Sequence, residues 1–344
     1  MNKIVELPLA EPMYSTYQFQ GPGTAAAPEN PSARNWILNE AVQLSCDKSF
    51  LSGRMTPFIN VEKSAWHDNP FFERISYPFL HTGGYINPVI RNLLDHGYYV
   101  CFGGVDDYYI KGKSWYHQRH FWHDGMICGY DREKSAYCIY AYDSSWIYRK
   151  FWTPQRCFDR AREAVRKAGG YGEVCGIRIK PDQVEFSPKA VYEKLRDYLD
   201  SSFDKYPVDG RGTARGSIVQ AYLAMYIGKL CDGSVPYDRM DNRVMRMLWE
   251  HKKVMQERIR KAEEALALGT AYSQAYQRIV SDANALRMLY ASHRVKRRDA
   301  VLPTIQKGLL RLKGDEECIL TDFTNRLGEE IEREAVEHPE KDNA

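Results

Sequence analysis

The chain has 344 residues, of which 44% are hydrophobic and 27% charged, a composition that excludes wholesale disorder and predicts two folded domains. Its 48 basic and 45 acidic residues leave a net charge of +3, which argues against a protein dedicated to nucleic-acid binding. The eight cysteines include no C-x-x-C pair, and no apolar run has the length of a signal peptide or a membrane span. We therefore expect a reduced, cytoplasmic protein with no membrane contact.

The first elements are predicted from turn residues and apolar spacing. Residues 1–33 become rich in Gly, Ala and Pro toward their end and predict a flexible lead-in. An apolar stripe with a repeat of about 3.6 residues then predicts a helix over 35–45. Further along, Asn87 and Pro88 are typical of a helix start and Gly97 of its end, and the apolar residues after Gly97 predict a buried strand.

A hairpin is the clearest feature of the middle of the chain. Two apolar, aromatic runs at 126–130 and 136–142 flank the polar residues 131–134, which predicts two antiparallel strands joined by a tight loop. Thr153-Pro154 is expected to open a helix, and residues 174–179 are expected to form another strand.

Beyond residue 180 the sequence is typical of long helices. Ser187-Pro188 predicts a helix start, and apolar residues keep helical spacing from 244 to 266. We therefore expect an α+β fold, in which a domain of antiparallel sheet and helices over 34–180 is followed by an α-helical domain over 181–344.

The hairpin also brings two chemically useful side chains together. With a three-residue loop, His123 lies opposite Asp143, and a four-residue loop shifts the register by one residue but keeps the pair adjacent. Opposed strand residues have Cα atoms about 4.5–5.5 Å apart, close enough for a carboxylate to accept a hydrogen bond from an imidazole N–H. The pair could supply the base and the orienting carboxylate of a catalytic triad, or it could be a core histidine or a surface ion pair.

A cysteine is the natural nucleophile for such a pair, because an imidazolium lowers the pKa of a thiol. Most cysteines, such as Cys101 and Cys128, lie in apolar strand sequences where a packing role is expected. Cys46 instead lies among polar residues. The candidate catalytic residues are therefore Cys46, His123 and Asp143, with a structural role as the alternative for Cys46.

Three other motifs are less informative. The H-x-x-H-x-x-H run at 117–123 could bind a metal, but positions three apart on an extended segment point to opposite faces, so we expect no metal site. Residues 112–114 resemble the end of a phosphate-binding loop, yet the required Gly five positions earlier is Asp107. The basic run at 293–298 is expected to be a solvated helix face, with docking of an acidic partner protein as the alternative.

The order of the candidate residues, Cys, then His at a strand start, then Asp at the end of the next strand, is that of papain-like cysteine enzymes. The sequences VDDYY at 105–109 and HFWHDGMICGYD at 120–131 resemble the family of the butirosin-pathway acyltransferase. That family joins a domain similar to bacteriocin-processing cysteine peptidases to a helical C-terminal region, and the resemblance covers roughly residues 34–180. The chain departs from the family where the nucleophile usually starts the first long helix, since Asn35 and Trp36 stand there.

The resemblance implies an amide-forming acyltransferase of antibiotic biosynthesis, akin to the amide-forming enzyme of closthioamide assembly. Such an enzyme takes an acyl group from the phosphopantetheine thioester of an acyl or peptidyl carrier protein and passes it to a small-molecule amine, with no cofactor of its own. On this reading His123, oriented by Asp143, deprotonates Cys46, which forms the acyl-enzyme. Two alternatives stay open: a thiol peptidase or thioesterase, and a catalytically silent papain-like binding module.

Overall fold

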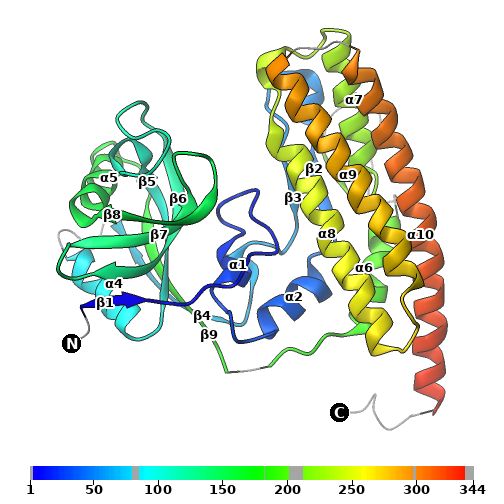
Figure 1. Cartoon of the computed structure of the whole chain (residues 1–344), viewed down its shortest axis with the longest axis horizontal. Helices are drawn as coiled ribbons and strands as arrows, with labels where there is room; N and C mark the ends of the chain where they lie inside the picture. Colours follow the sequence, from blue (N-terminus) through cyan, green and yellow to red (C-terminus); the bar gives the residue numbers. More distant parts are fainter. Residues whose placement is uncertain (1–2, 80–84, 182, 201–211, 297–299, 338–344) are drawn as a thin grey trace. The chain divides into compact units, whose positions relative to one another are not determined.

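The computed structural model describes residues 3–79, 85–181, 183–200, 212–296 and 300–337. The chain forms two compact units, one made of residues 1–33 and 65–184 and the other of residues 34–64 and 185–344 (Figure 1). The chain passes from the first unit to the second at 33/34, returns at 64/65 and passes again at 184/185. The structure differs from the prediction at 34–64, because this segment belongs to the helical unit.

The first unit is built on an antiparallel sheet of seven strands. The order is β4-β9-β5-β6-β7-β8, and β1 pairs with one end of β6. The predicted hairpin is confirmed, since Met126 pairs with Tyr140 and Asp131 with Ala136. The strands are β1 (Ile4–Glu6), β4 (Phe72–Pro78), β5 (Tyr99–Asp106), β6 (Trp122–Asp131), β7 (Ala136–Tyr142), β8 (Tyr148–Pro154) and β9 (Glu173–Ile179).

Alternate residues of these strands face two apolar layers. Val100 and Phe102 pack with helices α4 (Ile86–Asp95) and α5 (Gln155–Lys167). On the other face, Tyr99 and Cys101 pack against residues that include Ala25 of the short helix α1 (Pro22–Ala25). The helix predicted from Asn87 and Pro88 is α4, and Gly97 follows it with a φ of 77°, a conformation that favours glycine at a helix end.

The N-terminal segment is not the flexible lead-in that its composition predicted. Tyr14 is 1% exposed and Ala25 is fully buried. The Thr24 side chain accepts a hydrogen bond from the backbone N–H of Met13 at 3.0 Å, and Ala10 donates to the carbonyl of Ala25. Small residues in this segment allow the chain to pack closely on the sheet, so a sequence rich in Gly, Ala and Pro becomes part of the core.

The second unit combines a three-stranded antiparallel sheet, of order β10-β2-β3, with long helices. Helices α8, α9 and α10 lie side by side in Figure 1. No helix among the residues placed by the structure combines the length and apolar character needed to cross a membrane. The elements are α2 (Ser32–Glu40), β2 (Leu44–Asp47), β3 (Ile59–Val61), α6 (Pro188–Leu199), β10 (Thr213–Arg215), α7 (Val219–Cys231), α8 (Asn242–Ala265), α9 (Ala271–Lys296) and α10 (Val301–Glu337), with short 3₁₀ turns η1 (Lys48–Ser52) and η5 (Tyr237–Arg239). The 3₁₀ turns η2 (Trp66–Asp68) and η3 (Asp107–Tyr109) belong to the first unit.

Helix α2 ends earlier than the predicted helix over 35–45. The buried Arg258 of α8 donates to the carbonyl oxygens of Leu38 at 2.6 Å and of Ala41 at 3.0 Å. These carbonyls have no partner inside a helix that is ending, so the guanidinium satisfies them. The chain then enters β2, where Leu44 and Cys46 are buried.

Candidate functional site

The end of β5 is shaped by a β-bulge between Phe102 and Val105, where the register against β6 shifts by one residue. Gly104 lies in this bulge with a φ of 68°, and a Cβ atom there would collide with the carbonyl oxygen of Tyr171. Only glycine combines this φ with the close approach of another backbone. The bulge places Val105 opposite His123, and the two aspartates that follow Val105 lie beside the start of β6.

His123 is held by the second of these aspartates. Its Nδ1 lies 2.9 Å from Oδ2 of Asp107, whose carboxylate is almost completely buried, while the imidazole remains a quarter exposed. With Asp107 ionised, the Nδ1–H donates to the carboxylate and Nε2 is left as a proton acceptor. The ring of Phe121 stands edge-on to the imidazole at 5.0 Å between centroids. This is the arrangement of a general base and its orienting carboxylate.

A buried lysine lies behind Asp107. Lys113 Nζ is 3.8 Å from Asp107 Oδ1 and donates to Gln18 Oε1 at 2.9 Å. Gln18 in turn donates through Nε2 to the carbonyl of Asp124 at 2.8 Å. Burial lowers the pKa of Lys113, and the negative charge of Asp107 opposes this effect. The two oxygens of Asp107 therefore face different partners, Oδ2 the imidazole of His123 and Oδ1 the ammonium of Lys113.

A second His–Asp pair stands next to the first. His120 Nδ1 lies 2.6 Å from Asp106 Oδ2, and the backbone N–H groups of Tyr108 and Phe121 donate to Oδ1 of the same carboxylate. The His120 ring stacks on Tyr108 at 4.3 Å. Its side chain is 62% exposed, so this imidazole is far more open to solvent than that of His123.

The expected pair of His123 with Asp143 is not formed. Oδ1 of Asp143 accepts hydrogen bonds from the backbone N–H groups of Ser145 and Ile147 at 2.8 and 3.0 Å, and Oδ2 pairs with Arg149. Burial raises the pKa of Asp143, but these contacts outweigh it and hold the pKa below its usual value. Asp143 therefore closes the turn between β7 and β8, while η3, which directly follows β5, supplies the carboxylate for His123.

Cys46 lies in the other compact unit. It is in β2, paired with Ile59 on one side and Ala214 on the other, and is 3% exposed. A thiol enclosed in a sheet is shielded from substrates and is typical of a structural cysteine. The expected packing role of Cys101 and Cys128 is confirmed, since both are buried in the apolar layer of the first unit.

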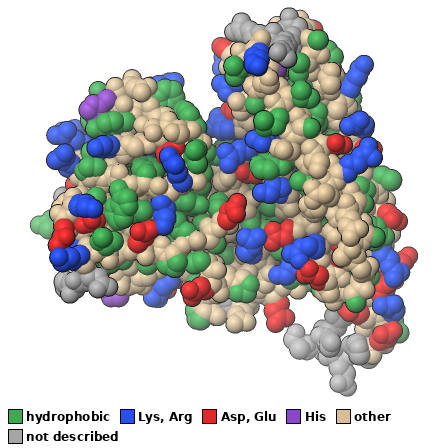
Figure 2. Space-filling view, in the orientation of Figure 1, with side chains coloured by type: hydrophobic (Ala, Val, Ile, Leu, Met, Phe, Trp, Pro, Cys, Tyr) green, Lys and Arg blue, Asp and Glu red, His purple; other side chains and the backbone are tan. Residues whose placement is uncertain are grey.

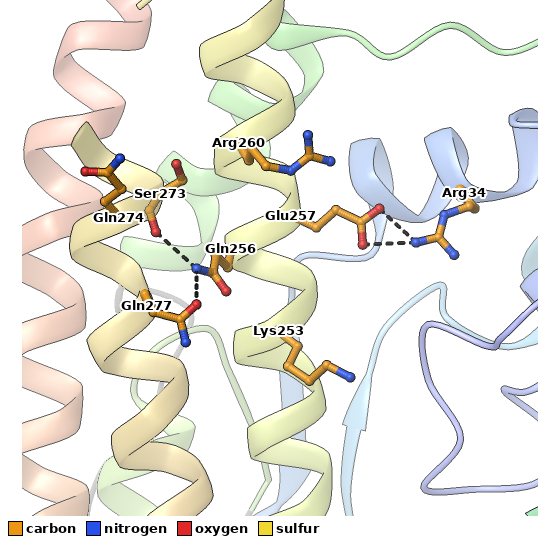
Figure 3. A pocket seen from close by; sticks show the side chains of 8 residues that line it. All are labelled: Arg34, Lys253, Gln256, Glu257, Arg260, Ser273, Gln274 and Gln277. Carbon is orange, nitrogen blue, oxygen red and sulfur yellow. Dashed lines mark hydrogen bonds and ion pairs between the residues drawn. The ribbon is translucent and has the colours of Figure 1, made fainter. Parts of the chain in front are cut away.

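Each compact unit has an open groove on its surface. One lies in the helical unit, where Arg34 of α2 pairs with Glu257 of α8 at 2.9 Å and Gln256 bonds Gln277 of α9 at 2.8 Å (Figure 3). Its main polar groups therefore satisfy one another. The other groove, in the first unit, is lined by α5 together with Asn87 and Tyr109.

Figure 2 shows Lys and Arg interspersed with Asp and Glu over the visible face rather than gathered in one field. No cluster of three or more His, Cys, Asp or Glu side chains suited to a metal occurs among the residues that the structure describes. In the H-x-x-H-x-x-H run, His120 and His123 have separate carboxylate partners and His117 stacks on Tyr108. The basic run at 293–298 lies partly outside the described residues.

Sequence reasoning missed Asp107, Lys113 and Gln18. The adjacent aspartates of VDDYY were a usable signal, because a strand that ends in two acidic residues often ends at a site. Lys113 and Gln18 carry no such signal. A comparison of the chain with models of protein families and with curated protein sequences gives no match.

Proposed function

We propose that the protein is an amide-forming acyltransferase in which His123 acts as the general base. The observation that carries this proposal is the hydrogen bond between Nδ1 of the partly exposed His123 and the buried Asp107 carboxylate, an arrangement in which Nε2 can serve as the proton acceptor. The papain-like character of the first unit belongs to the same proposal. It is supported by the resemblance of residues 105–109 and 120–131 and by the antiparallel sheet with helices.

The proposed reaction is the direct transfer of an acyl group from a thioester to an amine. As the amine nitrogen bonds to the carbonyl carbon, its proton passes to Nε2 of His123, and Asp107 stabilises the imidazolium. The C–S bond then breaks, and the proton moves from His123 to the departing thiolate. This route requires no cysteine, which agrees with the burial of Cys46. The exposed side chains of Phe121 and Trp122 next to His123 offer an apolar surface for the acyl group.

The test is amide formation by the full-length protein from an acyl-N-acetylcysteamine thioester, or an acyl carrier protein, with a panel of amines. His123→Ala should lower kcat/KM by about 10²- to 10⁴-fold, the usual contribution of a positioned base. Asp107→Asn should also lower it and change its pH profile. Asp143→Asn is the matched control, since this carboxylate serves the β7–β8 turn, and its activity should stay near that of the wild type.

The cysteine route remains the principal alternative, and the same assay separates the two. Under direct transfer, Cys46→Ala keeps its activity and the intact mass shows no acyl adduct. Loss of activity in Cys46→Ala, together with an adduct on Cys46 in the wild type, would overturn direct transfer. Free acid formed equally with and without an amine would instead identify a thioesterase or peptidase.

A binding module without catalysis is the second candidate, and the enclosure of the Cys46 thiol favours it. On that reading a loaded carrier protein or a small amine binds to the first unit and leaves unchanged. Saturable binding by calorimetry, combined with no turnover of any thioester, would establish this function instead.

A further inference from the structure

The groove on the first unit has an excess of positive charge. It has a volume of about 790 Å³ and lies along α5, with Asn87 from the first turn of α4 and Tyr109 from η3 at its border. Four cationic side chains and two carboxylates line it, so the lining carries a net charge of +2. These charged residues are Arg160, Arg162, Arg166, Lys167, Asp159 and Glu163.

Both carboxylates already have partners. Glu163 accepts a forked pair of hydrogen bonds from Arg166 at 2.8 and 2.7 Å and lies 3.8 Å from Lys167. Asp159 accepts two contacts from the side-chain amide of Asn87, at 3.0 and 2.9 Å. Since the two carboxylates neutralise only two of the four cationic side chains, the lining keeps its net charge of +2.

Arg162 is the unusual member of this set. The residue is 5% exposed, and its Nε and Nη1 atoms are buried with no hydrogen-bond partner. Its guanidinium carbon lies 5.7 Å from the centre of the Phe79 ring, a contact that orients the group but accepts no N–H bond. Buried guanidinium groups are normally paired, because removing the charge from water is costly. A side chain in this state that lines a groove indicates a binding site for an anion.

We propose that this groove binds a phosphate group through the forked guanidinium of Arg162. A planar guanidinium matches the oxygens of a phosphate in a two-point contact. The net charge of +2 in the lining favours an anionic phosphate group over a neutral polar group. The groove also includes the N-terminal turn of α4, whose N-cap residue Tyr85 provides no side-chain cap, and the positive end of a helix dipole attracts anions.

The groove is connected to the His–Asp pairs through η3. Tyr109, at its border, follows Asp107 by two residues, and its ring lies 6.0 Å from that of His120. The phosphate is therefore assigned to the acyl donor, as the phosphate of a pantetheine-type thioester. This second step rests on the proposed acyl transfer, whereas phosphate binding by itself does not.

Phosphate binding can be measured without any catalytic assay. Inorganic phosphate is titrated into the full-length protein by calorimetry at constant ionic strength, with acetate and chloride as comparison anions. Arg162→Met should weaken phosphate binding by roughly 10- to 100-fold, the loss expected for one charge-assisted forked contact. Arg156→Met, at the exposed start of α5, is the control and should bind phosphate as the wild type does.

The folding of the variant provides a second readout. Because two N–H donors of the buried Arg162 guanidinium have no hydrogen-bond partner, Arg162→Met should melt at the same temperature as the wild type or higher in chloride, and only the wild type should gain stability from phosphate. An equal phosphate response in the wild type and Arg162→Met would overturn the site. Acetate bound as tightly as phosphate would overturn the assignment to phosphate.

The donor assignment is tested with two thioesters that carry the same acyl group, one on 4′-phosphopantetheine and one on pantetheine. The wild type should prefer the phosphorylated donor in kcat/KM, and Arg162→Met should lose this preference, whereas the control Arg156→Met should keep it. His123→Ala should be inactive on both donors. If His123→Ala stays active, the acyl-transfer proposal fails, and this result is distinct from a loss of donor preference. A wild type that binds phosphate but does not distinguish the donors would overturn the donor assignment alone.

Discussion

The helical unit is centred on one buried carboxylate, and its removal gives a quantitative test of the packing. Glu316 of α10 is fully buried and accepts hydrogen bonds from Lys252 of α8 at 2.6 Å and from Gln220 of α7 at 2.5 Å. Tyr198 of α6 donates to it at 3.1 Å, and Tyr276 of α9 bonds its other oxygen. One side chain thus connects five helices through a contact with each of the other four.

Glu316→Gln keeps the shape of the side chain but leaves the Lys252 ammonium without its counter-ion. Burial lowers the pKa of Lys252, and Glu316 is the main group that opposes this effect. Breaking a buried ion pair from one side costs about 3–5 kcal/mol of unfolding free energy, a third or more of the stability of an ordinary domain. The double variant Lys252→Met/Glu316→Leu removes both charges, so its loss should be smaller than the sum of the single losses by at least about 1 kcal/mol.

Urea unfolding gives the free energies, and hydrogen exchange of peptides from α8 and α10 restricts the measurement to the helical unit. Glu264→Gln is the control, since its pair with Arg260 is half-exposed and should contribute less than about 1 kcal/mol. A loss below 1 kcal/mol for Glu316→Gln would refute the reasoning. Additive losses in the double variant would equally show that the two charges do not depend on each other.

Three further predictions follow from single residues. The His251 ring is fully buried and bonds the Val42 carbonyl, and burial holds its pKa well below 6.5. Because the unfolded chain takes up the proton first, the free energy of unfolding should fall as the pH drops below about 6.5, by up to about 1.4 kcal/mol per pH unit. His251→Gln should lose this part of the pH dependence in urea titrations. Gly104→Ala should lower the melting temperature through a cost of about 1–3 kcal/mol and reduce acyl transfer, since the bulge positions Asp107. The pKa of Asp143 is lowered in the folded state, so its contribution to the free energy of unfolding is present above about pH 4 and lost as the pH falls further. The stability difference between the wild type and Asp143→Asn, measured by urea unfolding, should therefore shrink in acid. A difference that stays constant with pH would contradict this role.

Local elements of the fold could be predicted because their signals lie within a few residues of one another. Asn87 and Pro88 mark the start of α4, and Ser187 caps α6 by accepting a hydrogen bond from the N–H of Ala190. The hairpin of β6 and β7 follows from two apolar runs around a polar loop. These features, and with them the α+β class, depend on backbone preferences and on short-range burial, which the order of residues determines directly.

The site depends instead on which neighbouring strands pair and in which register. The sequence by itself determined that His123 lies near the start of a strand and that a second strand follows it after a tight loop. Only the pairing of β5 with β6, together with the bulge at Gly104, decided that Asp107 rather than Asp143 holds the imidazole. In the same way, only the pairing of β2 with β10 placed Cys46 in the helical unit. Strand pairing is decided by burial summed over a whole sheet, so the local sequence could not decide between Asp107, 16 residues from His123, and Asp143.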